Sequence, residues 1–143
     1  MANATATQLQ QLYIAYFGRA ADPTGLDYWV KEGTSAKAFA ANMYAQDEFI
    51  NANSSISIER QVNQIYQNLF GRDGDSDGLI YWSTQIRTGK LELASIANDL
   101  IHAVNKGSSA TDLQALNNKT TAAEAFTEDI RDSNLAVLGY SAK

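Results

Sequence analysis

The chain contains no cysteine, a single proline and a single histidine. Without cysteine it has no disulfide, no thiolate zinc site and no thiol nucleophile. One histidine, His102, cannot supply a cluster of imidazole metal ligands, and no G-x-S-x-G sequence accompanies it as in serine hydrolases. With one proline and no alternating β-branched runs, the sequence also argues against a β-sheet. These absences favour a helical protein that is not an enzyme.

Long basic and long apolar runs are missing as well. Eleven Lys and Arg stand against sixteen Asp and Glu, a net charge of −5, so the chain lacks the positive charge of a nucleic-acid binder. No apolar run approaches the roughly 18–20 residues that span a bilayer. The first ten residues show neither the basic nor the apolar part of a cleavable signal. We expect no nucleic-acid partner and no membrane insertion, which leaves neutral glycans, metal cations and other protein chains as partners.

What the sequence does contain is an internal repeat. Residues 9–29 return 53 positions later as residues 62–82, without a gap and with ten identities. In both copies an apolar stripe with helical spacing precedes a turn glycine, Gly18 or Gly71. The stripes comprise Leu9, Leu12, Tyr13, Tyr16 and Phe17 in the first copy, and Val62, Ile65, Tyr66, Leu69 and Phe70 in the second.

Further helices follow each copy. Asp22 before Pro23 predicts a helix start, as N-cap and first helical residue. Later stripes are Ala36, Phe39, Met43 and Tyr44 in the first unit, and Ile96, Leu100, Ile101 and Val104 in the second. In the C-terminal segment we expect one or two helices, with these residues facing inward: Leu113, Leu116, Ala122, Ala125, Phe126 and Ile130.

The sequence therefore predicts an all-α fold of six to eight helices in one compact domain, residues 1–143. The first repeated unit covers about residues 8–55, the second about 58–107, and the C-terminal helical cap about 111–138. Polar stretches at residues 51–57 and 105–112 separate the three parts.

An acidic loop in the second copy predicts a calcium site. Asp73, Asp75 and Asp77 stand at positions 1, 3 and 5 of an EF-hand-like loop, with Gly78 at position 6. Position 12 is Thr84 instead of a bidentate glutamate, so any affinity should be weak, on the order of 10⁻⁴–10⁻³ M. The alternative is an ordinary interhelical loop in which Asp75 or Asp77 caps the helix that contains Trp82.

Arginine and aromatic residues recur at fixed places in both copies. Arg19 and Arg72 can either clamp the turn, with Asp22 and Asp75 as the nearby candidate partners, or recognise a hydroxyl or phosphate group. Trp29 and Trp82 are predicted to face the core, three residues after a motif leucine. The neighbouring side chains are rotated by about 100°, which places Tyr28 and Tyr81 at the rim as candidate carbohydrate contacts.

The residues at the loop–helix junctions form the pattern FGR-x-x-D-x-x-GL-x-YW. It resembles the signature of a helical domain family of unknown function that occurs in tandem in bacterial S-layer and RTX-type secreted proteins. The residues that carry the resemblance most clearly are Arg19, Asp22, Gly25 and Trp29, and in the second copy Arg72, Gly78 and Trp82. Segments 39–49 and 117–127 are also similar to family segments, so the resemblance extends over roughly residues 8–130.

This resemblance implies a context. Such domains occur in calcium-dependent exoproteins exported by type I secretion, whose signal lies at the far C-terminus. It implies the N-terminal domain of a longer S-layer-like protein, anchored to the O-antigen polysaccharide of lipopolysaccharide outside the outer membrane. Neighbouring S-layer subunits are further expected partners, with calcium as the expected ion. A protein–protein assembly or linker scaffold is the alternative function.

Overall fold

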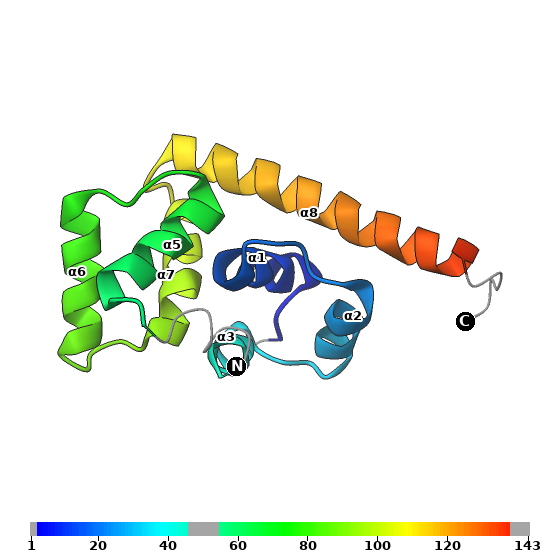
Figure 1. Ribbon diagram of the computed structural model, residues 1–143, viewed down its shortest axis with the longest axis horizontal. Helices are drawn as coiled ribbons and strands as arrows, with labels where there is room; N and C mark the ends of the chain where they lie inside the picture. The colour runs from blue at the N-terminus through cyan, green and yellow to red at the C-terminus, as the bar shows by residue number, and fades with distance from the viewer. Residues whose placement is uncertain (1–2, 46–54, 138–143) are drawn as a thin grey trace.

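A computed structural model describes residues 3–45 and 55–137, and within these ranges every regular element is a helix. The all-α prediction is therefore confirmed. The elements, in chain order, are α1 (Ala6–Phe17), α2 (Pro23–Lys31), α3 (Ala36–Tyr44), α5 (Ile58–Phe70), α6 (Ser76–Arg87), α7 (Leu93–Asn105) and α8 (Ala110–Val137) (Figure 1). Residues 51–54 of the first predicted linker lie outside the described residues.

The two helices that open the repeats end in the same way. Gly18 closes α1 with φ 68° and Gly71 closes α5 with φ 69°, both left-handed. In each case the glycine N–H donates to the carbonyl oxygen four residues earlier, at 2.9 Å. A left-handed residue is a common helix stop and costs glycine little, because it has no Cβ. The predicted stops at these two glycines are confirmed.

The core forms where α1 meets the other helices. α1 packs against α5, α3 and α8, and α3 packs against α7. Fully buried side chains of high volume come from several helices: Leu9, Leu12, Phe39, Val62, Leu69, Ile96 and Leu116. The first-copy and second-copy helices also touch directly, because the Asn68 side-chain amide donates to the Ala15 carbonyl at 2.9 Å. These two residues hold equivalent positions in the repeat, 53 residues apart.

Helix α8 lies across both repeated parts. It contacts α1, α2, α5 and α7, and Figure 1 shows it as one long helix that passes over α1 and runs on toward α2. The predicted C-terminal cap is thus a single helix. Within the described ranges, no helix is both long and apolar enough to cross a membrane.

The buried face of α8 differs from the one predicted. Phe126 is 55% exposed, and Ala122 and Ala125 are exposed as well. The residues that face the body are Leu116, Thr120, Ala123 and Thr127, and of these only Leu116 was predicted to face inward. These four also have helical spacing, but two of them are threonines that satisfy their hydroxyls with backbone carbonyls. The prediction is therefore confirmed for Leu116 and for Leu113, which is partly buried against the core, and wrong for Ala122, Ala125 and Phe126.

Candidate functional site

In each repeat a side-chain amide holds the motif loop against the first helix. The Gln10 Oε1 atom accepts the N–H of Ala21 at 2.7 Å, and the Asn63 Oδ1 atom accepts the N–H of Gly74 at 2.7 Å. Residues 10 and 63, like residues 21 and 74, are equivalent positions of the repeat. Sequence reasoning missed these anchors, although an amide side chain stands at this place in both copies. Both loops are consequently fixed with the same geometry.

Asp22 and Asp75 cap the helices that follow the loops. The Asp22 carboxylate accepts the N–H of Gly25 at 2.9 Å, and the Asp75 carboxylate accepts the N–H of Gly78 at 3.3 Å. The N-cap predicted at Asp22 is confirmed. In the second copy, the alternative in which an aspartate caps the Trp82 helix is confirmed for Asp75.

Gly25 and Gly78 stand where a side chain would make close contacts. A Cβ atom on Gly25 would lie 2.9 Å from the Asp22 carboxylate and 3.0 Å from the Tyr13 hydroxyl oxygen. The second copy is equally crowded: a Cβ on Gly78 would lie 2.8 Å from the Asp75 carboxylate and 2.9 Å from the Tyr66 hydroxyl oxygen. The motif glycine therefore leaves room for the capping carboxylate and the tyrosine hydroxyl.

The two tryptophans support the loops from inside. Both are half-buried and pack against the core. The Trp82 Nε1–H donates to the Tyr66 hydroxyl at 3.1 Å. The Trp29 ring packs edge to face against the Phe39 ring, with the ring centroids 5.2 Å apart. Their place against the core agrees with the sequence prediction.

The neighbouring tyrosines point outward in both copies. Tyr28 is 55% exposed and Tyr81 is 54% exposed. Each stands edge to face against its tryptophan, with ring centroids 5.1 Å apart for Tyr28 and 4.9 Å apart for Tyr81. The pairs sit on α2 and α6, which lie toward opposite ends of the molecule (Figure 1). The fold therefore presents two separate aromatic surfaces with one local geometry.

Arg72 reaches a distant partner. Its Nε and one terminal nitrogen donate to the two Asp112 carboxylate oxygens at 2.8 and 2.6 Å, and its other terminal nitrogen donates to the Asp73 carbonyl at 2.8 Å. The guanidinium also lies over the Tyr66 ring, 5.3 Å from its centroid. These hydrogen bonds lower the pKa of Asp112. The predicted pairing of Arg72 with Asp75 is wrong. Asp75 caps α6, and the carboxylate that pairs with Arg72 is Asp112 of α8.

Arg19 is arranged differently from Arg72. Its guanidinium lies over the Phe17 ring, 5.3 Å from the centroid, while the carboxylate of its predicted partner Asp22 caps α2. In this copy the link to α8 is made by Arg131, which donates to both carboxylate oxygens of Asp27 at 2.6 and 3.1 Å. The two repeats therefore use different arginine–aspartate pairs to hold α8.

The acidic loop is tied to protein donors. One Asp73 carboxylate oxygen accepts the side-chain amides of Asn63 at 3.2 Å and Gln67 at 2.5 Å, which lowers the pKa of Asp73. Asp75 serves as helix cap. No group of three or more His, Cys, Asp or Glu residues able to hold a metal ion occurs among the residues that the structure describes. Asp73, Asp75 and Asp77 do not form such a group, and calcium binding stays a prediction.

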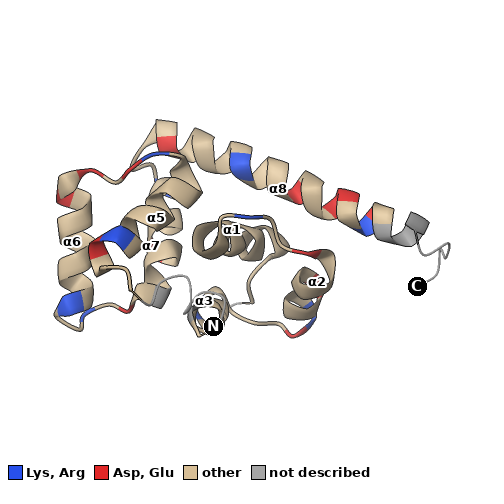
Figure 2. Ribbon diagram, in the orientation of Figure 1, with Lys and Arg blue, Asp and Glu red and all other residues tan. Residues whose placement is uncertain are grey.

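The single histidine and the charged residues are spread over several helices of the described chain. His102 is exposed in the last turn of α7. Figure 2 shows that the basic and acidic residues are distributed over several helices, with acidic residues in the loop before α6 and along α8.

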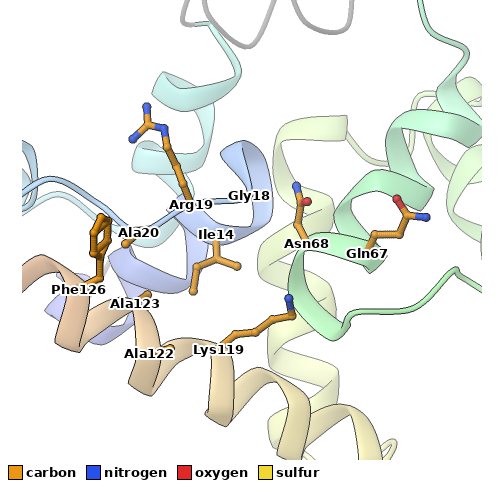
Figure 3. Close-up of a pocket in the computed structure, with 10 residues that line it drawn as sticks. All are labelled: Ile14, Gly18, Arg19, Ala20, Gln67, Asn68, Lys119, Ala122, Ala123 and Phe126. Carbon is orange, nitrogen blue, oxygen red and sulfur yellow. The ribbon is translucent and has the colours of Figure 1, made fainter.

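A pocket opens where α1, α5 and α8 meet, and sequence reasoning did not predict it. Its volume is about 320 Å³. Its lining is apolar and polar in similar measure and consists of Ile14, Gly18, Arg19, Ala20, Gln67, Asn68, Lys119, Ala122, Ala123 and Phe126 (Figure 3). Because these residues come from three separate segments, no local pattern in the sequence marks them as a group.

Comparison with known proteins gives one family match. The profile of a family described as a domain of unknown function (DUF4214) matches residues 40–103. The matched stretch runs from α3 to α7 and contains the complete second motif loop. No curated protein and no solved structure shows significant similarity to the chain.

Proposed function

We propose that the chain is a non-catalytic cell-surface module that binds polysaccharide. The observation that carries the proposal is the pair of exposed tyrosines, Tyr28 and Tyr81, each braced by a tryptophan with the same edge-to-face geometry. A tyrosine of this kind offers an apolar ring face together with a polar hydroxyl. These are the two features that a sugar ring, with its CH faces and hydroxyl edges, can use.

Two such sites on one chain suit a polymeric ligand. Tyr28 and Tyr81 lie on different helices toward opposite ends of the molecule. A single aromatic contact binds a sugar weakly, but linked sites raise the effective concentration and hence the avidity. A lattice of copies would multiply the effect. The mechanism we propose is therefore multivalent binding by shallow sites.

The resemblance supplies the setting for this proposal. It points to the anchoring domain of an S-layer or related RTX-type exoprotein, secreted by the type I route and retained on O-antigen outside the outer membrane. The family match to residues 40–103 agrees with the resemblance over the second motif but names no function. Polysaccharide, secretion and surface location are accordingly parts of the proposal.

The lack of a suitable acid or base at the pocket supports a non-catalytic role. The pocket between α1, α5 and α8 is lined by no aspartate, glutamate or histidine. Glycoside hydrolysis generally needs two carboxyl groups about 5–10 Å apart. Binding without bond cleavage is the simpler role for such a surface.

Co-sedimentation tests the proposal directly. The purified chain is mixed with lipopolysaccharide that carries or lacks O-antigen, in calcium and in chelator, and the bound fraction is measured. We expect binding that requires O-antigen and falls severalfold in Tyr28→Ala and in Tyr81→Ala, and further in the double variant. Ile80→Ala, a change at an exposed neighbour of Tyr81, serves as the matched control. Equal sedimentation with and without O-antigen would refute the proposal.

An assembly scaffold is the second candidate, favoured by one observation. Ile80 is 62% exposed and stands beside the exposed Tyr81 on α6, where it could meet another protein. Sedimentation velocity over a range of concentrations tests this candidate. Concentration-dependent self-association that Ile80→Ala abolishes, together with no binding to O-antigen, would favour the scaffold over the anchor.

A further inference from the structure

We propose that the pocket between α1, α5 and α8 binds a sugar that carries an anionic group, either a carboxylate or a phosphate. This inference deepens the proposed polysaccharide-binding function and rests on it for the biological ligand. It concerns a site separate from the tyrosine surfaces, and it assigns a ligand charge that the motif residues do not specify.

The charge of the lining is the first argument. The charged residues of the lining are Arg19 and Lys119, both basic. The whole chain carries a net charge of −5, so its long-range field repels anions. An anion would therefore bind only where local positive charge outweighs that field.

Lys119 is the residue we assign to the anion. Among the described residues it has no carboxylate partner, and its Cε lies only 3.6 Å from the position of a Cβ on Gly71. Figure 3 shows its ammonium group rising beside Asn68, with the Arg19 guanidinium directed away. The latter lies over the Phe17 ring instead. An ammonium group placed beside an open pocket is a suitable donor for a carboxylate or phosphate oxygen.

Phe126 provides the surface for the sugar ring. It is 55% exposed and stands at the other side of the pocket from Lys119, with Ile14 and Ala123 between them (Figure 3). An exposed phenyl ring leaves apolar surface in contact with water, which is unfavourable. Covering it with the CH face of a sugar would reduce that contact.

The size and polarity of the pocket suit one monosaccharide unit. A volume of about 320 Å³ lies at the lower end of the range of roughly 300–1,000 Å³ for ligand sites. The side-chain amides of Gln67 and Asn68 line the same side as Lys119. Gln67 donates one amide hydrogen to Asp73 and Asn68 donates one to Ala15, and each amide nitrogen carries a second hydrogen that a sugar hydroxyl can accept. The pocket thus combines apolar residues, the Phe126 ring, two side-chain amides and the Lys119 ammonium group. These are the groups that an acidic sugar needs.

NMR titration of the full chain with defined probes tests the assignment. The probes are trigalacturonate, mannose 6-phosphate and neutral maltotriose. We expect amide shifts around the pocket with at least one of the two anionic probes and none with maltotriose at equal concentration. The probe that binds identifies the anion as carboxylate or phosphate. No shift with either anionic probe would overturn the assignment.

Variants separate the charge from the fold. Lys119→Gln should weaken anionic-probe binding about tenfold or more, because a charge-assisted hydrogen bond is lost, and Lys119→Arg should largely retain it. Phe126→Ala should also weaken binding. The control Lys106→Gln removes an exposed lysine outside the pocket lining and should leave binding unchanged. Equal loss in the Lys106 and Lys119 variants would overturn a local site.

The two proposals fail separately. If O-antigen co-sedimentation succeeds but no anionic probe binds, only the pocket assignment is wrong. If an anionic probe binds through Lys119 but O-antigen does not sediment the chain, the pocket stands and the proposed cell-surface function is wrong.

Discussion

Arg72 and Asp112 form a two-point ion pair between the second motif loop and the first turn of α8, with N–O distances of 2.8 and 2.6 Å. Forty residues separate them in the chain. The Asp112 side chain is buried, whereas Arg72 remains 41% exposed. This pair joins the repeated motif to the helix that covers both repeats.

Asp112→Asn should destabilise the protein by about 1–2 kcal/mol, between the values for exposed and buried ion pairs. The asparagine keeps the shape of the side chain but loses the charge that faces Arg72. Chemical denaturation measures the change in the free energy of unfolding. A double-mutant cycle with Arg72→Gln isolates the pair, and a coupling energy near zero would contradict its role.

Stability should also fall in acid through this pair. Arg72 lowers the pKa of Asp112 below its ordinary value of 3.8, and Arg131 does the same for Asp27. The stabilisation is therefore complete above the unfolded-state pKa. It is lost as the pH falls through the lowered folded-state pKa, because the unfolded chain binds protons first. Denaturation between about pH 5 and pH 2 should show a decline that is shallower in Asp112→Asn. An unchanged slope in that variant would contradict the assignment.

Thr127→Val should cost about 1–3 kcal/mol, since it leaves buried polar groups without a partner. The buried Thr127 hydroxyl donates to the Ala21 carbonyl at 2.6 Å and accepts the Gln10 amide at 3.0 Å. Thermal or urea unfolding measures the loss. Thr121→Val on the exposed side of α8 is the control and should be nearly neutral. Similar losses of stability in the two variants would show that Thr127 does not lie on the buried face of α8.

Gly78→Ala should destabilise the protein by about 1 kcal/mol, the value of a helix cap. In an unobstructed helix the same change would stabilise, because alanine restricts the unfolded chain. Here the new Cβ would lie 2.8 Å from the capping Asp75 carboxylate. Ser76→Ala, an exposed neighbour in the same turn, is the control for urea unfolding. A more stable Gly78→Ala variant would show that the contact is easily relieved.

Asp75→Ala should lower stability by about 1 kcal/mol, and Asp75→Asn by much less, since asparagine is an equally good cap. Because capping needs no metal, we expect the same loss in millimolar calcium and in chelator. Melting temperatures under both conditions test this. A calcium-dependent rise in melting temperature that disappears in Asp75→Asn would instead support the predicted calcium site.

Helix positions and helix ends could be predicted because they depend on neighbouring residues. Gly18 and Gly71 stop their helices through a local preference for positive φ, and Asp22 starts α2 by bonding a backbone N–H three residues away. The spacing of Leu9, Leu12 and Tyr13 likewise predicted buried positions of α1, although the helix is buried on every side from Leu9 to Tyr16. All of these signals act within about one helical turn.

The sequence by itself thus determined the helices, their caps, the motif glycines and the outward place of Tyr28 and Tyr81. Only the tertiary structure decided which carboxylate Arg72 meets and which face of α8 is buried. It also decided that Lys119 and Phe126 line one pocket. The physical reason is that these contacts join segments far apart in the chain. Which partner a polar side chain finds in such a contact depends on how the helices pack, and the periodicity within one helix carries no information about that packing.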